Sequence, residues 1–214
     1  MMIKICGLSR EQDIDYVNEA RPDYCGFVFA ASKRQVSPAQ PAQLRQRLAE
    51  GITVAGVFVN ASVGDIIALY RDGVIDIAQL HGDEDKAYIA HLKEASGNTP
   101  IPVIQVIKSS NLKTPCPLCP PCLCENSSED NNADYYLIDS GSGSGETFDW
   151  GLLNSLNIDK PWFLAGGINL DNIEQAMAIN PFGVDISSGA ETDGVKDREK
   201  ILQLVTTIRK GNTV

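Results

Sequence analysis

Two glycine-containing segments near the C-terminal end of the sequence have the composition of an anion-binding site. They are Gly166-Gly167, which follows the apolar run 162–165, and Ser187-Ser188-Gly189, which closes the next apolar run. Glycine lets the backbone approach an anion closely, and successive backbone N–H groups can then point at it. Ordinary turns would explain either segment alone, but the two together favour a site for a phosphate group.

Polar side chains also stand at the carboxyl ends of the other apolar runs. They are Cys6-Gly7, Lys33-Arg34, Asn60, Gln79, His81-Gly82, Lys108, Asp139 and Asp185. Free cysteine titrates near pH 8.5 and free aspartate near pH 3.9, so Cys6 and Asp139 could both take part in proton transfer. Each also has a structural interpretation. Cys6 could be a small buried apolar residue, as we expect for Cys25, and Asp139 a capping or solvated carboxylate.

The apolar runs themselves are the elements that must position these side chains. There are eight, rich in Val, Ile and Phe, at residues 2–6, 24–29, 54–59, 75–81, 103–107, 135–139, 162–165 and 184–187. Most are continuously apolar, which is typical of parallel strands buried on both faces. Eight such units favour a closed (β/α)8 TIM barrel over an open flavodoxin-like sheet of about five strands. In such a barrel the carboxyl ends of the strands form the active site.

Helix-start signals lie between most of the runs and support this α/β alternation. Segments 9–12 and 37–40 each fit a capping box, with Pro38 at the first helical position. An apolar stripe at helical spacing follows Asn169, and Asp197 precedes a last helix that ends in basic residues.

One unit departs from the alternation. Residues 109–134 should contain the fifth helix, but their four prolines forbid a regular one. We therefore expect an irregular Pro/Cys-rich excursion there, inserted in a single barrel domain of residues 1–214. Its four thiols could bind a soft metal, although their spacing fits neither usual zinc nor iron–sulfur patterns, and the default expectation is no metal. This cysteine cluster consists of Cys116, Cys119, Cys122 and Cys124.

Composition limits the partners of the chain. A net charge of −10 argues against a non-specific hold on nucleic acid or an anionic membrane. No apolar run approaches the roughly 20 residues of a membrane span, and the first run is too short for a signal peptide. We therefore predict a cytoplasmic protein with reduced cysteines and a small phosphorylated ligand. We expect a monomer, with a homodimer as the alternative.

A further glycine-rich run, residues 140–147, resembles a nucleotide-binding loop only superficially. Glu146 stands where that loop requires a lysine, so a triphosphate site is not expected. A flexible loop that closes over substrate is the preferred interpretation, and a solvated linker is the other.

Several motifs occur in one order along nearly the whole chain. They are Lys4-Ile5-Cys6-Gly7, Gly26-Phe27-Val28-Phe29, the segment 32–38, Gly56-Val57-Phe58-Val59-Asn60, Gln79-Leu80-His81-Gly82, the segment 143–150, Leu164-Ala165-Gly166-Gly167-Ile168 and Val184-Asp185-Ile186-Ser187-Ser188-Gly189. In this order they resemble the phosphoribosylanthranilate isomerases of tryptophan biosynthesis. The Lys-Ile-Cys-Gly and Asp-Ile-Ser-Ser-Gly motifs are the most specific, and only residues 109–134 depart from the pattern.

The resemblance implies a cofactor-independent Amadori rearrangement of N-(5'-phosphoribosyl)anthranilate to 1-(2-carboxyphenylamino)-1-deoxyribulose 5-phosphate. An acid must open the ribose ring, and a base must remove the proton on the adjacent carbon. Cys6 matches the family's base and Asp139 its acid. We expect N–H groups and positive charge to lower the pKa of Cys6, and burial or the substrate's anions to raise that of Asp139.

The same resemblance assigns residues to substrate binding. Arg34 matches the residue that meets the anthranilate carboxylate, for which its forked guanidinium is suited, although it could instead form a surface salt bridge. Gln79, His81 and Asp185 look like pocket residues, and His81 could also be a structural histidine. The phosphate-binding residues are expected to be Gly166, Gly167, Ser187, Ser188 and Gly189.

Two other functions stay open at this point. One is a dual-specificity sugar-phosphate isomerase that also serves histidine biosynthesis. Such enzymes look to use an aspartate where this chain has Cys6. The other is a non-catalytic metal-binding or redox-sensing barrel built around the cysteine cluster.

Overall fold

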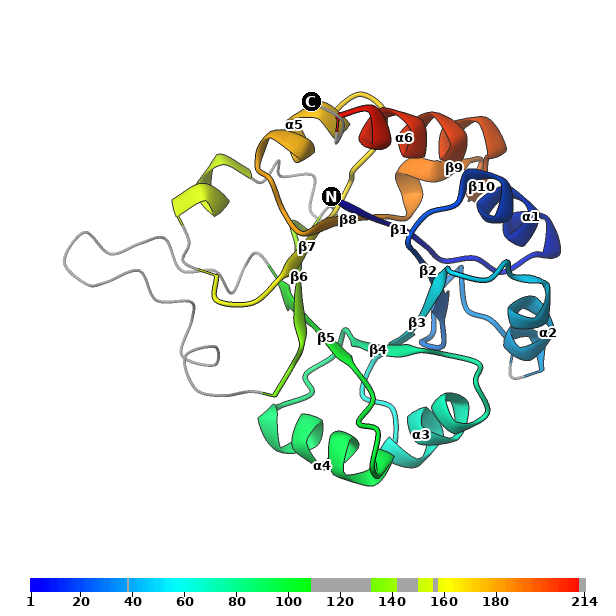
Figure 1. The fold of residues 1–214 in the computed structure, drawn as a ribbon, viewed down its shortest axis with the longest axis vertical. Helices are drawn as coiled ribbons and strands as arrows, with labels where there is room; N and C mark the ends of the chain where they lie inside the picture. Colours follow the sequence, from blue (N-terminus) through cyan, green and yellow to red (C-terminus); the bar gives the residue numbers. More distant parts are fainter. Residues whose placement is uncertain (38, 109–131, 142–149, 156–157, 212–214) are drawn as a thin grey trace.

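The computed structural model describes residues 1–37, 39–108, 132–141, 150–155 and 158–211. Eight parallel strands close into a barrel in which each strand pairs with its neighbours in sequence order, and β8 pairs with β1 (Figure 1). The TIM barrel is therefore confirmed, and the open sheet is excluded. The strands are β1 Met2–Cys6, β2 Tyr24–Val28, β3 Thr53–Phe58, β4 Ile77–Leu80, β5 Val103–Lys108, β6 Tyr135–Asp139, β7 Trp162–Ala165 and β8 Gly183–Ile186.

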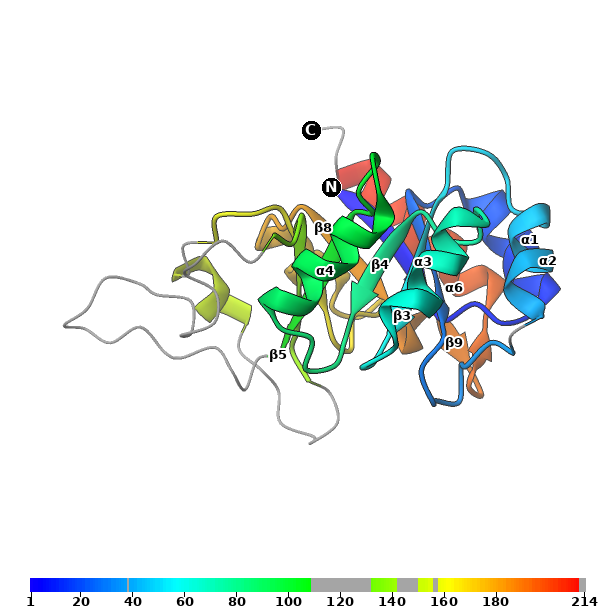
Figure 2. The ribbon, with the colours of Figure 1, turned by 90° about the horizontal axis from the view of Figure 1, so that it is seen from below.

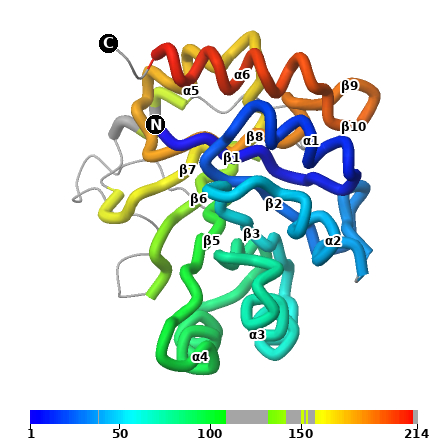
Figure 3. Tube along the Cα trace, turned by 45° about the vertical axis from the view of Figure 1, so that its right-hand side comes forward, coloured from blue at the N-terminus to red at the C-terminus, as the bar shows by residue number. Residues whose placement is uncertain are grey.

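Helices surround the barrel as an outer layer, and α6 lies beside both α1 and α5 (Figures 1 and 3). None of the described helices is long and apolar enough to cross a membrane. The α-helices are α1 Glu11–Ala20, α2 Gln40–Arg47, α3 Val63–Arg71, α4 Lys86–Ser96, α5 Ile173–Ala178 and α6 Arg198–Gly211, and the 3-10 helices are η2 Trp150–Ser155 and η3 Ser188–Ala190.

A short hairpin, β9 Glu191–Thr192 and β10 Val195–Lys196, follows β8. In Figure 2 this hairpin lies at one end of the barrel and the N-terminus at the other. The hairpin therefore stands at the end where the strands terminate, which is the end that carries the active site in this fold.

Between β5 and β6 the structure describes residues 132–134 alone, so the predicted lack of a regular fifth helix stays a prediction. The predicted excursion falls mainly on residues 109–131, which lie outside the described residues together with the cysteine cluster. The same is true of most of the glycine-rich run 140–147, of which residues 140 and 141 are described.

Helices begin near the predicted positions, but some of the capping residues and first residues differ from the prediction. Helix α1 begins at Glu11, and its start is capped by Asp13, whose Oδ2 accepts from the backbone N–H groups of Ser9 and Arg10, both at 2.9 Å. The prediction of a box over residues 9–12 is therefore wrong by one residue, because Asp13 reaches these N–H groups from the first turn.

The start of α2 keeps half of its predicted capping box. The backbone N–H of Ser37 donates to Oε1 of Gln40 at 3.2 Å, and the helix begins at Gln40. Pro38, which we predicted at the first helical position, lies outside the described residues.

The last two helices give one correction and one confirmation. Helix α5 begins at Ile173, later than predicted from Asn169, because Oδ1 of Asn172 accepts the N–H of Asn169 at 2.8 Å and holds a turn before the helix. Helix α6 begins at Arg198, directly after Asp197 as predicted.

Strand β1 shows how the chain sorts its side chains. Ile3 and Ile5 are fully buried in the apolar layer between the barrel and the helices. Lys4 and Cys6 alternate with them and point into the barrel, since successive side chains of a strand lie on opposite faces. Strand β1 thus packs against the helices with one face and contributes Lys4 and Cys6 to the barrel interior with the other.

The barrel interior is apolar near the amino ends of the strands. The ring of Phe163 contacts the rings of Tyr24, Tyr135 and Phe182, with centroids 5.4, 6.1 and 5.4 Å apart. Phe163 has no exposed surface. This aromatic cluster closes the barrel below the polar end and leaves that end free for chemistry.

We predict that Phe163→Ala lowers the free energy of unfolding by about 3–5 kcal/mol, because it removes a fully buried ring and leaves a cavity. Urea denaturation followed by circular dichroism measures the loss. The control is Val59→Ala, at a side chain that is 47% exposed, which should change stability by less than about 0.5 kcal/mol. Equal losses in both variants would contradict the assignment of Phe163 to the core.

Candidate active site

A cavity of about 360 Å³ lies at the carboxyl ends of the strands, a volume sufficient for a small organic ligand. All the predicted site residues except Gly189 line it. These residues are Cys6, Arg34, Gln79, His81, Asp139, Gly166, Gly167, Asp185, Ser187 and Ser188. Residues separated by up to 182 positions in sequence are thus brought to one cavity by the closure of the barrel.

The two predicted phosphate loops lie against each other at one side of this cavity. Gly166 and Gly167 have φ values of +97° and +68°, a backbone conformation that favours glycine. Gly189 does not line the cavity. A Cβ atom at Gly189 would lie 1.8 Å from the carbonyl oxygen of Ile168, so its lack of a side chain lets the second loop pack on the first. The role of Gly189 in phosphate binding stays a prediction.

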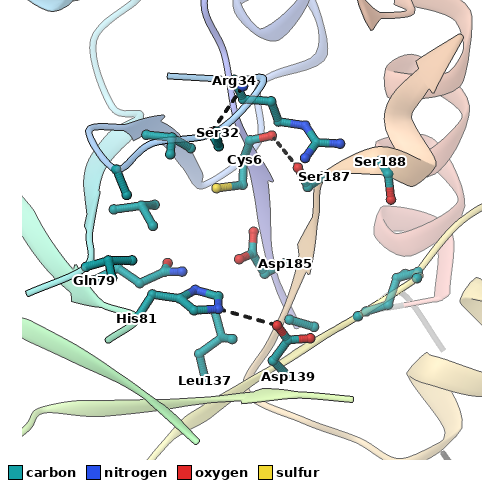
Figure 4. Close-up of a pocket in the computed structure, with 18 of the residues that line it drawn as sticks. Cys6, Ser32, Arg34, Gln79, His81, Leu137, Asp139, Asp185, Ser187 and Ser188 are labelled. Carbon is teal, nitrogen blue, oxygen red and sulfur yellow. Dashed lines mark hydrogen bonds and ion pairs between the residues drawn. The ribbon is translucent and has the colours of Figure 1, made fainter. Parts of the chain in front are cut away.

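Cys6 and Asp139 lie on opposite sides of the cavity, with Asp185 between them (Figure 4). Cys6 is 6% exposed and ends β1. Burial raises the pKa of the Cys6 thiol, while Lys4 acts to lower it and Asp185 adds to the rise. The expectation of a lowered pKa is therefore wrong for the ligand-free protein, because desolvation outweighs the nearby positive charge.

Asp139 ends β6 and faces His81, which follows β4. The Nε2 atom of His81 lies 3.5 Å from Oδ2 of Asp139, and the backbone N–H of Gly141 donates to Oδ1 at 3.1 Å. The hydrogen bond from His81 lowers the pKa of Asp139 despite the opposing effect of burial, and Gly141 adds to the lowering. The predicted rise is therefore absent when no substrate anion is present.

Lys4 is a site residue whose role was not predicted from the sequence. Its side chain is fully buried, and its Nζ donates to Oδ2 of Asp185 at 2.9 Å. Burial acts to lower the pKa of Lys4, but the charges of Asp185 and Cys6 leave it raised, so the ammonium form is held. A lysine two residues before Cys6 in an apolar strand was the available signal, since i and i+2 share one face.

Two buried oxygen atoms of the described residues have no hydrogen-bond partner, and both belong to side chains that line the cavity. They are Oε1 of Gln79 and Oδ1 of Asp185. An unpaired buried acceptor costs about 1–3 kcal/mol, so these atoms mark places where a ligand can donate hydrogen bonds. Two unpaired acceptors at one cavity are thus suited to a ligand that carries hydroxyl groups.

Arg34 lines the cavity but its guanidinium is already held by Glu191. Its Nε and one terminal nitrogen, Nη2, donate to the two oxygens of Glu191 at 2.6 and 2.8 Å. Lys196 donates to Oε1 of Glu191 at 2.5 Å and to the carbonyl of Ser187 at 3.0 Å. Burial would raise the pKa of Glu191, yet Arg34 and Lys196 lower it to about 2. Neither Glu191 nor Lys196 was predicted, because their partners lie far away or on another hairpin strand.

The known proteins that this chain is similar to agree with one another. The family model described as N-(5'-phosphoribosyl)anthranilate (PRA) isomerase matches residues 3–207. The N-(5'-phosphoribosyl)anthranilate isomerase of Endomicrobium trichonymphae is 42% identical over 213 residues, covering 97% of this chain and 98% of the relative. The enzyme of that name from Clostridium acetobutylicum is 39% identical over 216 residues, covering 97% of this chain and 98% of the relative.

Solved structures give the same result for the fold. The crystal structure of TrpF from Jonesia denitrificans has a TM-score of 0.81 at 29% identity and covers 100% of this chain and 98% of its own. A phosphoribosyl anthranilate isomerase in complex with reduced 1-(o-carboxyphenylamino)-1-deoxyribulose 5-phosphate has a TM-score of 0.75 at 27% identity, covering 98% of this chain and 99% of its own.

We predict that Glu191→Gln destabilises the protein by about 2–3 kcal/mol at pH 7, because it leaves Arg34 and Lys196 without their carboxylate. A carboxyl group whose pKa is lowered by folding stabilises the native state above its unfolded pKa, near 4.5. The difference between wild type and variant should therefore shrink as the pH falls from 4.5 towards 2. Urea titrations between pH 7 and pH 3 measure it, and a difference independent of pH would contradict the assignment.

Proposed function

This chain belongs to the N-(5'-phosphoribosyl)anthranilate (PRA) isomerase family, and from that membership we propose how its cavity carries out the rearrangement. The chain is an isomerase that acts on N-(5'-phosphoribosyl)anthranilate in tryptophan biosynthesis. The roles of its individual residues are our proposal.

The reaction needs an acid and a base at two places on one sugar. The acid protonates the ribose ring oxygen, so that the bond from this oxygen to C1 breaks and an iminium forms. The base then removes the proton from C2, which gives an enamine that tautomerises to the ketone. No oxidant or cofactor enters this balance, since the electrons of the C2–H bond move within the substrate.

Asp139 is the proposed acid, with His81 as its partner. In the ligand-free protein the hydrogen bond from His81 keeps the pKa of Asp139 low, so the carboxyl group must gain its proton in the complex. The substrate carries a phosphate and a carboxylate, and nearby negative charge raises the pKa of a carboxyl group. His81, 3.5 Å away, can supply the proton that Asp139 then donates to the ring oxygen.

Cys6 is the proposed base on the opposite side of the cavity. Its placement across from Asp139 lets one residue act on C2 while the other acts on the ring oxygen. The single observation that carries this proposal is the convergence of both residues on a cavity that also contains unpaired acceptors, Oε1 of Gln79 and Oδ1 of Asp185. These acceptors are suited to the ribose hydroxyl groups.

The remaining cavity residues hold the two anionic ends of the substrate. The two loops that meet there, with Gly166, Gly167, Ser187, Ser188 and Gly189, are the proposed phosphate site. Arg34 is the proposed partner of the anthranilate carboxylate. The Nη1 group of Arg34, which does not contact Glu191, is the part of the guanidinium left for that carboxylate.

The family membership weighs against the two other functions considered from the sequence. The metal-sensing alternative depends on the cysteine cluster, which lies outside the described residues. Cys6 at the end of β1 also counts against dual specificity. Enzymes of that kind look to use an aspartate at this position. The cytoplasmic location stays a prediction.

We propose that the chain is a monomer, with a homodimer as the alternative. One similar solved structure is described as mutually generated monomers of the dimeric phosphoribosylanthranilate isomerase from Thermotoga maritima, so the relatives include a dimeric enzyme. Among the described residues the large hydrophobic side chains that are exposed are Met2, Val59 and Val195, at 36, 47 and 45%. They come from β1, the end of β3 and β10, and such scattered residues are normal on a monomer.

We predict that Cys6→Ser and Asp139→Asn each lower kcat at least about 10²-fold with the fold intact, because each removes one proton transfer. The loss of fluorescence of N-(5'-phosphoribosyl)anthranilate measures turnover. The matched control is Cys25→Ala, at a second buried cysteine, on the neighbouring strand, that does not line the cavity. Near wild-type turnover in either site variant would remove that residue from the mechanism.

We predict a mass near 23 kDa in light scattering coupled to size-exclusion chromatography, the mass of one chain. The measurement is repeated over a hundredfold range of protein concentration. A constant mass of twice this value would establish the homodimer instead.

A further inference from the structure

We propose that Lys4 is the positioning residue for the catalytic thiol, and that its buried ammonium group stabilises the thiolate form of Cys6. The inference rests on the proposed role of Cys6 as the base and adds a residue to it. Lys4 and Cys6 are two positions apart on β1 and share the inner face of the strand.

The space around the two side chains is closed by β2. Cys6 pairs with Gly26 in the register of β1 and β2. A Cβ atom at Gly26 would lie 2.7 Å from Sγ of Cys6 and 3.3 Å from Nζ of Lys4. Both reactive atoms therefore border the same small volume, which Gly26 leaves open for them.

The ammonium group has no access to water. Lys4 is 0% exposed, and its Nζ donates to Oδ2 of Asp185 at 2.9 Å. An ammonium group has three donors, and the sulfur of Cys6 borders the same small volume at Gly26 as the Lys4 Nζ. A buried charge is tolerated only where acceptors and counter-charges surround it, so the side chain is fixed between Asp185 and Cys6.

This arrangement counteracts the desolvation of Cys6. Burial favours the neutral thiol, and a nearby positive charge favours the thiolate. Lys4 has the largest effect in the second direction, and Lys196 makes a smaller contribution of the same sign. Asp185 acts in the opposite direction, so the pair Lys4–Asp185 sets the ionisation of Cys6 through two effects of opposite sign.

The test is a direct titration of the thiol in Lys4→Met and Asp185→Asn variants. The background carries Cys25→Ala and serine at the four positions of the cysteine cluster, so that Cys6 is the only thiol. The rate of alkylation by iodoacetamide as a function of pH, with thiolate absorbance in the ultraviolet, gives the apparent pKa. The control is Lys93→Met, at a lysine that pairs with Asp134 away from the cavity.

We expect Lys4→Met to raise the apparent pKa of Cys6 by at least about one pH unit, and Asp185→Asn to lower it. In Lys4→Met the acid limb of kcat/KM against pH should move upward by the same amount, with activity partly regained at high pH. A uniform loss of activity with an unchanged thiol titration would mean a merely structural role and would overturn the proposal.

Lys4→Met leaves the Asp185 carboxylate buried without its partner, which can prevent folding. The double variant Lys4→Met/Asp185→Asn removes both charges and keeps the site neutral. Its apparent pKa should still exceed that of the background protein, because Lys4 acts on Cys6 more strongly than Asp185 does. An unchanged value in this folded variant also overturns the proposal.

The titration and the activity of Cys6→Ser separate the two hypotheses. If Cys6→Ser keeps full activity, the base role fails, while the thiol titration still reports whether Lys4 controls Cys6. If Cys6→Ser is inactive and the titration is unchanged by Lys4→Met, only the role of Lys4 fails.

Discussion

The pairing of β1 with β8 is the constraint on which the site depends, because it closes the barrel and sets the register of its most polar strands. Lys4 lies opposite Asp185 in this register, and their buried ion pair joins the first strand to the last. Two residues further along, the hydroxyl of Ser187 donates to the carbonyl of Cys6 at 3.2 Å. A slip of one residue would turn all of these side chains out of the barrel.

The interior divides into two parts along the strands, and this division explains how a polar site survives in a small barrel. Near the amino ends, aromatic rings around Phe163 fill the interior and provide hydrophobic stabilisation. Towards the carboxyl ends, Lys4 pairs with Asp185, and Asp139 has His81 and the backbone N–H of Gly141 as partners. Gln79 and Asp185 are the places where this pairing is incomplete, and both face the cavity. The aromatic packing near the amino ends thus offsets the free-energy cost of the unpaired polar groups at the carboxyl ends.

The strands and most of the cavity residues could be predicted from the sequence because each depends on local pattern and chain order. Continuous apolar runs gave all eight strands within a few residues, and the fold then brought Cys6, Asp139 and the loop glycines together. Lys4 and Glu191 could not be given roles, since their partners stand 181 and 157 positions away in sequence. The directions of the pKa shifts were also beyond reach, because they depend on how burial compares with those distant charges.

The charges around the cavity fit an anionic substrate despite the strong negative charge of the whole chain. Lys4 and Asp185 cancel each other, whereas Arg34 and Lys196 share the single carboxylate of Glu191. This side of the cavity therefore keeps an excess positive charge beside the loop of Ser187. That positive charge attracts an anion. Once bound, the anion places negative charge in the cavity that Asp139 also lines. Binding of the substrate would thus favour the protonated form of Asp139, the proposed acid, against the hydrogen bond from His81 that lowers its pKa.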